Sequence, residues 1–204
     1  MAGLFELTDA DRAAAAAHAK AARAEAAKTD LPADTPLRPV QHVAVIGAGT
    51  MGGGIAMAMA GAGLSVTLID ADAAGLERGL ARVKDNYAGS VQRGRLAQAE
   101  MDERLARIRG TLAIADAADA DLWIEAVFED MGLKQSLFRQ IDAVAKPGAI
   151  LATNTSGLDI GEIAAVTSRP QDVVGAHFFS PAHVQKLLEV VRTDTTAADV
   201  VATL

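Results

Sequence analysis

The 204-residue sequence contains no cysteine, and aromatic residues make up only 3% of it. The absence of cysteine excludes a disulfide scaffold, a thiolate metal site and a cysteine nucleophile, and we expect no metal centre. Alanine is abundant, but its small side chain buries little apolar area. The core must therefore rest on runs of Val, Ile and Leu, which lie after residue 40.

Basic residues and long apolar runs are also scarce. The chain has 19 Lys and Arg against 26 Asp and Glu, a net charge of -7. An acidic chain without a basic block is a poor candidate for nucleic-acid or membrane-surface binding. The apolar runs fall far short of the roughly 20 residues that a membrane helix needs, and the opening residues MAGLFELTDADR carry acids where a signal peptide needs bases. We expect a soluble, cytoplasmic protein with no nucleic-acid or membrane partner.

The composition changes near residue 40. Residues 9–28 combine alanine with charged residues, which predicts a helix without an apolar stripe. Residues 29–39 hold three of the six prolines, a composition typical of a linker. We expect a helix and linker over residues 1–40, one domain over residues 41–192, and the start of another domain, an amphipathic helix, over residues 193–204.

Apolar strand patterns alternate with helical patterns after residue 40. Strands that are nearly continuous in Val, Ile and Leu, with helices between them, indicate an α/β fold with a mostly parallel sheet covered on both faces. The strands are predicted at residues 43–46, 65–69, 111–114, 122–128, 149–153, 173–178 and 187–191, and the helices at residues 50–62, 73–92, 98–109, 131–145 and 159–167.

A glycine motif follows the first predicted strand. Gly47, Gly49 and Gly52 form G-x-G-x-x-G, in which the first glycine permits a tight turn, the second lets a pyrophosphate approach, and the third lets helix and strand pack closely. The motif alone is weak evidence for a dinucleotide site. However, Asp70 ends the next strand, where an acid accepts hydrogen bonds from an adenosine ribose. Together they predict a dinucleotide site in a Rossmann-type, doubly wound sheet.

Asp70 also bears on the choice of cofactor. A carboxylate there accepts the two ribose hydroxyls and repels a 2'-phosphate. The next residues, Ala71 and Asp72, provide no arginine for such a phosphate. NAD is therefore favoured over NADP, while FAD stays open from this motif.

A histidine and a glutamate stand out in the second half. His177 ends a predicted strand, and the carboxyl ends of the strands form the ligand crevice of an open α/β sheet. Glu189 lies inside the apolar run LLEVV, where an unpaired buried carboxylate would be costly. We expect Glu189 to pair with His177 and to make it a general base. A structural role for His177, and His183 as the partner of Glu189, stay open.

From Val43 to Val191 the sequence resembles the NAD-binding domain of the L-3-hydroxyacyl-CoA dehydrogenases of fatty acid β-oxidation. Four blocks occur in order: VAVIGAGTMGGGIA, IEAVFED, NTSGL and GAHFFSPAHVQKLLEVV. The N-terminal helix and linker resemble, more loosely, the connector of multifunctional β-oxidation proteins, in which an enoyl-CoA hydratase region comes first. An acyl-CoA substrate and such a region in the same parent polypeptide are implied.

The resemblance implies a role for each matching residue. His177 would remove the 3-hydroxyl proton while hydride passes from C3 to NAD, and Glu189 would stabilise the imidazolium. Ser156 would lie near the nicotinamide and the substrate hydroxyl, as part of the catalytic set. Cofactor-site positions are Gly47, Gly49, Met51, Gly52, Asp70, Val127, Phe128, Glu129, Lys134, Ser156 and Ser180, and positions for coenzyme A are Asn86 and Arg93.

Two of these assignments have alternatives, and one further acidic residue of the blocks is assigned no catalytic role. Ser180 stands where many relatives have asparagine, and its shorter side chain puts a polarising role in doubt. A solvated helix lysine is the alternative interpretation of Lys134. Glu125 is expected to be structural and not catalytic.

The family's second, all-helical domain, which supplies a further asparagine and much of the acyl pocket, should begin near residue 193 and is missing. We therefore expect the NAD-binding domain of a 3-hydroxyacyl-CoA dehydrogenase with little or no activity by itself. Two alternatives stay open. One is a self-sufficient small oxidoreductase of a related 3-hydroxy acid, and the other is a non-catalytic dinucleotide-binding module.

Overall fold

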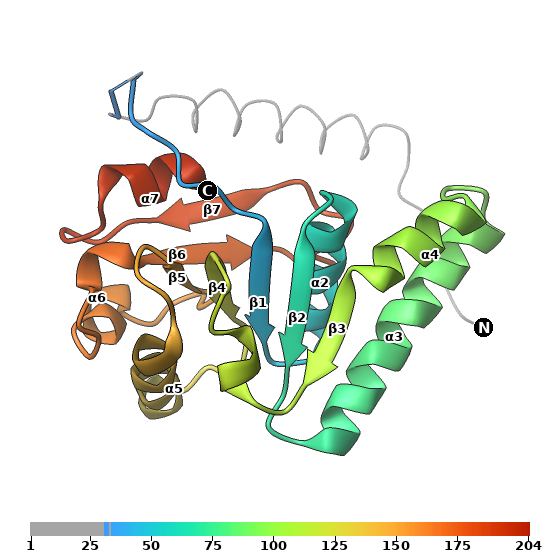
Figure 1. Cartoon of the computed structure of the whole chain (residues 1–204), viewed down its shortest axis with the longest axis horizontal. Coiled ribbons are helices and arrows are strands. Elements are labelled where there is room, and N and C mark those ends of the chain that lie inside the picture. Colours follow the sequence, from blue (N-terminus) through green and yellow to red (C-terminus); the bar gives the residue numbers. More distant parts are fainter. Residues whose placement is uncertain (1–30, 33) are drawn as a thin grey trace, which may run out of the picture. The chain divides into compact units, whose positions relative to one another are not determined.

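The computed structural model describes residues 31, 32 and 34–204 (Figure 1). The helix predicted over residues 9–28 lies outside the described residues. The chain divides into two units, Met1–Thr35 and Pro36–Leu204. Every helix and strand of the described part belongs to the second unit.

The second unit contains a seven-stranded sheet in the order β3-β2-β1-β4-β5-β6-β7. All neighbouring strands are parallel except β6 and β7, which are antiparallel. The chain runs outward from β1 to β3 and then returns to the other side of β1, so the strand order reverses between β1 and β4, where ligands bind in such sheets. The strands are β1 His42–Ile46, β2 Ser65–Ile69, β3 Ile108–Thr111, β4 Leu122–Glu125, β5 Ile150–Thr153, β6 Val173–Phe178 and β7 Leu188–Val191.

Helices cover both faces of the sheet and enclose two apolar layers (Figure 1). Successive side chains of a strand point to opposite faces, so Val43 and Val45 of β1 pack in the layer under α2, whereas Ala44 and Ile46 pack in the layer under α5. The helices are α2 Thr50–Gly61, α3 Ala73–Gln92, α4 Gln98–Ala106, α5 Met131–Val144, α6 Ile160–Ala164 and α7 Ala198–Thr203, with 3-10 turns η1 Ile114–Ala117 and η2 Pro170–Asp172.

Aspartates fix where three of the helices begin. The carboxylate of Asp72 accepts a hydrogen bond from the Gly75 amide at the start of α3, and Asp130 accepts one from the Leu133 amide at the start of α5. Asp159 does the same for α6. These side chains satisfy amides that have no partner inside the helix.

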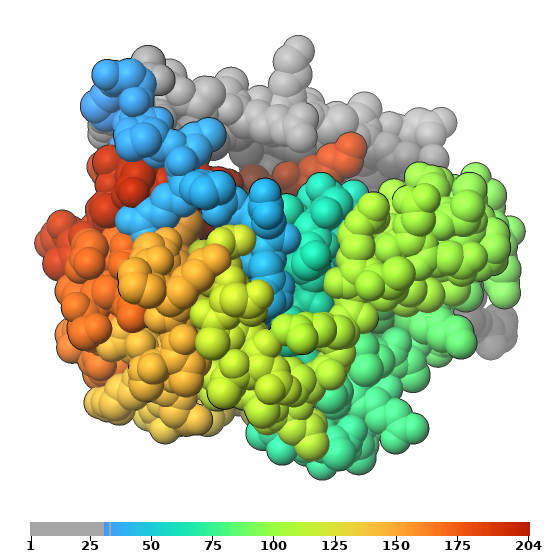
Figure 2. Space-filling view, in the orientation of Figure 1, coloured from blue at the N-terminus to red at the C-terminus, as the bar shows by residue number. Residues whose placement is uncertain are grey.

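Charged side chains join segments at the amino ends of the strands. Arg38 precedes β1 and donates to Asp199 of α7, to Asp172 before β6 and to the Gly148 carbonyl before β5. In Figure 2 the blue part of the second unit that leads into β1, which contains Arg38, lies beside the red C-terminal helix. Asp121 before β4 accepts from the amide of His42 and pairs with Lys146.

The segment around β3 departs from the sequence prediction. We expected a helix over residues 98–109 and a strand over 111–114, but α4 ends at Ala106 and the strand is Ile108–Thr111. The strand sequence IRGT lacks apolar alternation, and its place in the sheet comes from parallel pairing with β2, in which Val66 lies opposite Ile108 and Leu68 lies opposite the exposed Gly110. A Cβ there would lie 2.9 Å from Leu80 Cδ1. Tertiary packing therefore outweighs the local pattern.

The strand predicted over residues 122–128 also ends early, at Glu125. The Oε1 atom of Glu125 accepts a hydrogen bond of 2.7 Å from the amide of Val127, and this bond turns the chain out of the sheet. The bounds of β2, β6 and α3 agree with the sequence prediction. No helix in the described ranges is both long and apolar enough to cross a membrane.

Candidate active site

The glycine loop lies between β1 and α2. Gly47 has a φ of 101°, and a Cβ there would lie 2.6 Å from the carbonyl oxygen of Ala126 at the end of β4. A Cβ at Gly52 would lie 1.7 Å from the Gly47 oxygen, so the third glycine allows the close approach of helix and loop. A Cβ at Gly49 would meet nothing within 4 Å. The open surface at the second glycine fits a pyrophosphate on the loop amides.

Asp70 closes the loop from the end of β2. Its Oδ2 accepts a hydrogen bond of 2.8 Å from the Ala48 amide, and its Oδ1 accepts one of 3.1 Å from the Asp72 amide. The helix α3 packs tightly behind the loop, since a Cβ at Gly79 would lie 2.4 Å from the Ala48 oxygen. The glycine loop and Asp70 are therefore joined by a direct hydrogen bond, and the binding of a ribose by Asp70 stays a prediction.

A buried ion pair lies beyond the carboxyl end of β4. Lys134 of α5 is 1% exposed and Glu125 is fully buried, and Lys134 Nζ donates to Glu125 Oε1 over 2.7 Å. The other oxygen of Glu125 accepts from the Thr153 hydroxyl of β5. The alternative of a solvated helix lysine is therefore wrong, and Glu125 is structural as expected. A contact of Lys134 with the cofactor stays a prediction.

Glu129 links the loop after β4 to the loop after β5. Its Oε1 accepts hydrogen bonds from the Thr155 hydroxyl and from the Ser156 amide, and its Oε2 lies 3.4 Å from Lys134 Nζ. Burial alone would raise the pKa of Glu129, but those hydrogen bonds and the charge of Lys134 hold it below its ordinary value. The carboxylate is thus held ionised between two loops.

His177 and Glu189 are cross-strand neighbours in the antiparallel pair β6 and β7. His177 Nδ1 lies 2.8 Å from Glu189 Oε2, so the predicted pairing is confirmed. The reason that we gave for it is wrong: the side chain of Glu189 is 54% exposed, because β7 is the edge of the sheet and alternates its side chains. The His177 ring lies 4.7 Å from the ring of Phe179.

His183 is not the partner of Glu189. Its Nδ1 is buried without a hydrogen-bond partner among the described residues, and burial lowers the pKa of its imidazole. Sequence reasoning also missed the role of Asn154, whose side-chain oxygen accepts from the Phe178 amide over 2.8 Å and joins the end of β5 to the end of β6. The only sequence signal for this role of Asn154 was its position in the NTSGL block.

The other predicted positions lie in the loops at the carboxyl ends of the strands or along α3. Phe128 is 86% exposed in the loop after β4, and Ser156 and Ser180 are exposed after β5 and β6. Asn86 of α3 donates to Met57 Sδ over 3.8 Å, and the exposed Arg93 follows the last residue of α3, Gln92. The described residues contain no cluster of three or more His, Asp or Glu that could hold a metal ion.

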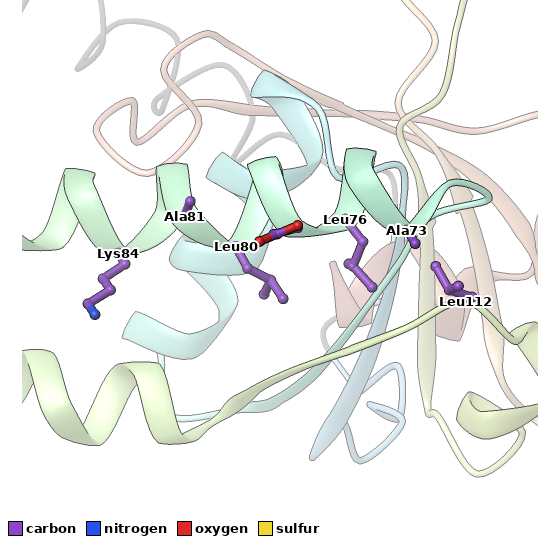
Figure 3. A pocket seen from close by; sticks show the side chains of 7 residues that line it. Ala73, Leu76, Leu80, Ala81, Lys84 and Leu112 are labelled. Carbon is purple, nitrogen blue, oxygen red and sulfur yellow. The ribbon is translucent and has the colours of Figure 1, made fainter.

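Two hollows in the surface are lined by other residues. One, of about 490 Å³, lies where Leu76 and Leu80 extend from α3 toward the side of Leu112 (Figure 3). The other, of about 650 Å³, lies between α6 and the segment after β7. Neither is lined by the glycine loop or by His177.

Known proteins share this arrangement. The chain is 41% identical over 167 residues to the probable 3-hydroxybutyryl-CoA dehydrogenase of Bacillus subtilis, covering 80% of this chain and 58% of the relative. It is 43% identical over 167 residues to the peroxisomal bifunctional enzyme of Cavia porcellus, covering 82% of this chain and 23% of that protein. The chain thus spans about a quarter to three fifths of the length of these curated relatives.

Solved structures and a family model agree with these relatives. The crystal structure of 3-hydroxybutyryl-CoA dehydrogenase from Escherichia coli K12 superposes with a TM-score of 0.79 at 43% identity, covering 81% of this chain and 35% of that one. The model of the family "3-hydroxyacyl-CoA dehydrogenase, NAD binding domain" matches residues 42–204. The chain therefore belongs to the NAD-binding domain family of the 3-hydroxyacyl-CoA dehydrogenases.

Proposed function

We propose that this chain carries the NAD site and the general base of an L-3-hydroxyacyl-CoA dehydrogenase, which oxidises the 3-hydroxyl of an acyl-CoA to a 3-oxo group. The strongest support is the 2.8 Å hydrogen bond between His177 and Glu189 at the carboxyl end of β6. The His177 side chain keeps 24% of its surface exposed, so a substrate can reach it.

The pair suits proton transfer from an alcohol. An ionised Glu189 only accepts hydrogen bonds, so Nδ1 of His177 carries its hydrogen toward Glu189. Nε2 is then the basic nitrogen and takes the hydroxyl proton, while the charge of Glu189 stabilises the imidazolium. NAD, when bound, supplies the acceptor for the hydride that leaves C3. Proton and hydride together account for the conversion of the alcohol to the ketone.

The proposal also assigns residues to the substrate hydroxyl and to coenzyme A. Ser156, exposed at the loop after β5 with its amide bonded to Glu129, would face the substrate hydroxyl. Coenzyme A would contact α3 near Asn86 and Arg93. We further propose that the chain binds NAD but turns over slowly until the all-helical domain of the family is supplied.

Reduction of acetoacetyl-CoA, followed by the loss of NADH absorbance, tests the proposal. With the all-helical domain of the family added to both proteins, we expect the rate of the chain to exceed that of His177→Ala by about 100-fold to 10,000-fold, the usual contribution of a general base. Calorimetry should give both proteins the same affinity for NAD, which shows that the variant is folded. Equal rates in two folded proteins that bind NAD would overturn the role of His177.

The same assay separates the two alternatives. A rate near the typical enzyme value of about 10 per second in this chain alone would favour a self-sufficient oxidoreductase. NAD binding without any rate above that of the His177→Ala variant, also after addition of the helical domain, would favour a non-catalytic module. The intact hydrogen bond between His177 and Glu189 argues against that module.

A further inference from the structure

The loop between β6 and β7 packs against α2, the helix that follows the glycine loop. A Cβ at Gly54 of α2 would lie 3.2 Å from the Cβ of Ala182 and 3.3 Å from its backbone nitrogen. Gly54 is buried, and Ala182 is 4% exposed. The neighbouring Gly53 has more room, because a Cβ there would meet the side chain of Val83 at an ordinary 3.5 Å. Of the two glycines, Gly54 alone allows the close approach of the loop.

Two costs to stability accompany this contact. Alanine favours a helix more than glycine does, so a glycine inside α2 is a local disadvantage. His183, which follows Ala182, has its Nδ1 buried without a hydrogen-bond partner in the described part of the chain. An unpaired polar atom in the interior also destabilises a fold. Stability is therefore a weak explanation for holding the loop against Gly54.

The loop joins the proposed base to its partner carboxylate. It follows β6, which carries His177, and leads into β7, which carries Glu189. The carbonyl of Pro181 accepts a hydrogen bond of 2.9 Å from the amide of Val184, so the loop makes a turn around Ala182. A shift of this turn is therefore transmitted along a short path to both strands.

Helix α2 is held in place on its other sides. A Cβ at Gly52 would lie 1.7 Å from the Gly47 oxygen, so the first turn of α2 lies directly on the glycine loop. Further along α2, the carbonyl of Met57 accepts a hydrogen bond of 3.0 Å from the Tyr87 hydroxyl of α3. A larger side chain at Gly54 would therefore displace the loop between β6 and β7, and not the helix.

The two strands that the loop connects are held unequally. β6 lies between β5 and β7, and its Phe178 amide donates to the side-chain oxygen of Asn154 over 2.8 Å. β7 is the edge of the sheet and pairs with β6 alone. Displacement of the loop should therefore move Glu189 away from His177 and weaken the 2.8 Å hydrogen bond between them.

We propose that the contact between Gly54 and Ala182 is a positioning contact, which holds the Glu189 carboxylate at the imidazole of His177. The inference rests on the proposed function. Through this contact, the helix whose amino end receives the pyrophosphate also sets the geometry of the general base. Misplacement of a group by about 1 Å can cost about 100-fold in rate, so a small shift of the loop has a measurable effect.

Proton NMR of the full chain tests the positioning. The bond to Glu189 protects the hydrogen on Nδ1 of His177 from exchange with water, and the absence of its signal in His177→Ala assigns it. We expect the signal in the unmodified chain and in the control Gly53→Ala, and its loss by exchange in Gly54→Ala. Calorimetry should give these proteins the same Kd for NAD within about twofold, because the glycine loop does not move.

Reduction of acetoacetyl-CoA, with the all-helical domain added, measures the effect on the reaction. We expect the kcat of Gly54→Ala to fall about tenfold, while its KM for NADH stays within about twofold of the unmodified value. Gly53→Ala should keep both values. A merely structural role of Gly54 would lower the melting temperature and leave the kcat of the folded protein unchanged.

The reciprocal change restores the space. Ala182→Gly removes the Cβ that a methyl group at Gly54 would meet. In the Gly54→Ala chain it should recover the Nδ1 signal and most of the kcat, whereas in the unmodified chain it should raise neither. Recovery in one background alone identifies a direct contact between the two positions.

Three results would overturn the proposal. They are the same Nδ1 signal and kcat in Gly54→Ala and Gly53→Ala, a Kd for NAD that rises as much as kcat falls, and no recovery in the double variant, whether Gly54→Ala folds or not. If the unmodified chain binds no NAD, or reacts no faster than His177→Ala, the proposed function fails and this role fails with it.

Discussion

The polar groups at the amino ends of the strands have a different role from those at the carboxyl ends. At the amino ends, Arg38, Lys146 and Arg169 each join two or more segments through carboxylates and carbonyls. At the carboxyl ends, the loop around Gly49 is open and His177 stays partly exposed beside Glu189. Changes at the carboxyl ends should therefore alter ligand binding, and changes at the amino ends should alter stability.

The largest effect on binding is expected for Gly52→Ala. The added Cβ would lie 1.7 Å from the Gly47 oxygen, so the whole loop must move. We expect the affinity for NAD to fall by about 100-fold or more, about 2.7 kcal/mol, with a lower melting temperature, measured by calorimetry and thermal unfolding. Unchanged binding would mean that the loop does not hold the pyrophosphate.

Gly49→Ala separates ligand binding from stability, because the new methyl group meets no protein atom within 4 Å. It would occupy the space into which the pyrophosphate fits, so we expect about a tenfold loss of NAD affinity, about 1.4 kcal/mol, and an unchanged melting temperature. Loss of stability without loss of affinity would contradict the assignment of this surface to the ligand.

At the amino ends, Arg38→Met should show the reverse pattern. It removes hydrogen bonds to Asp199, Asp172 and the Gly148 carbonyl and leaves Asp172, which is 7% exposed, without its cation. We expect the free energy of unfolding to fall by about 2 kcal/mol, typical for bonds to charged groups, with NAD affinity unchanged. Denaturant unfolding measures it, and Arg82→Met on the exposed side of α3 is the control.

The smallest effect concerns Asp142, at the end of α5. Burial would raise the pKa of its carboxyl, but hydrogen bonds from Ser168 and Arg169 hold that pKa below its ordinary value. A lowered pKa stabilises the fold above the unfolded value near pH 3.9, and that stability is lost as the pH falls through the folded value.

Asp142→Asn should lower the free energy of unfolding by about 1 kcal/mol at neutral pH and make the loss of stability below about pH 4 less steep. Urea unfolding at several pH values measures both effects. An acid dependence as steep as that of the unmodified chain would show that Asp142 does not contribute to it.

The glycine loop and Asp70 could be predicted because both depend on spacing along the chain. The glycines act through the backbone, and the strand before them is continuous in apolar residues, so the local sequence carries the information. The pairing of His177 with Glu189 was predicted from an expected burial of Glu189, which is 54% exposed, and the two residues meet because they lie opposite each other in the antiparallel pair β6 and β7.

Other features depended on contacts between distant segments. The burial of Lys134 follows from the packing of α5 against the end of β4, and a helix lysine in isolation gives no sign of it. The exposure of Glu189 follows from the position of β7 at the sheet edge. The strand β3 lies at Ile108–Thr111 because these residues pair with β2, a contact between distant segments.

Calorimetry of the full chain with NAD and with NADP tests the central claim most directly, namely that the carboxyl ends of β1 and β2 bind NAD. The Asp70 carboxylate holds the Ala48 amide of the glycine loop and would repel a 2'-phosphate. We expect NAD to bind at least about tenfold more tightly than NADP, about 1.4 kcal/mol. Tighter binding of NADP, or no binding of either nucleotide by the folded chain, would contradict it.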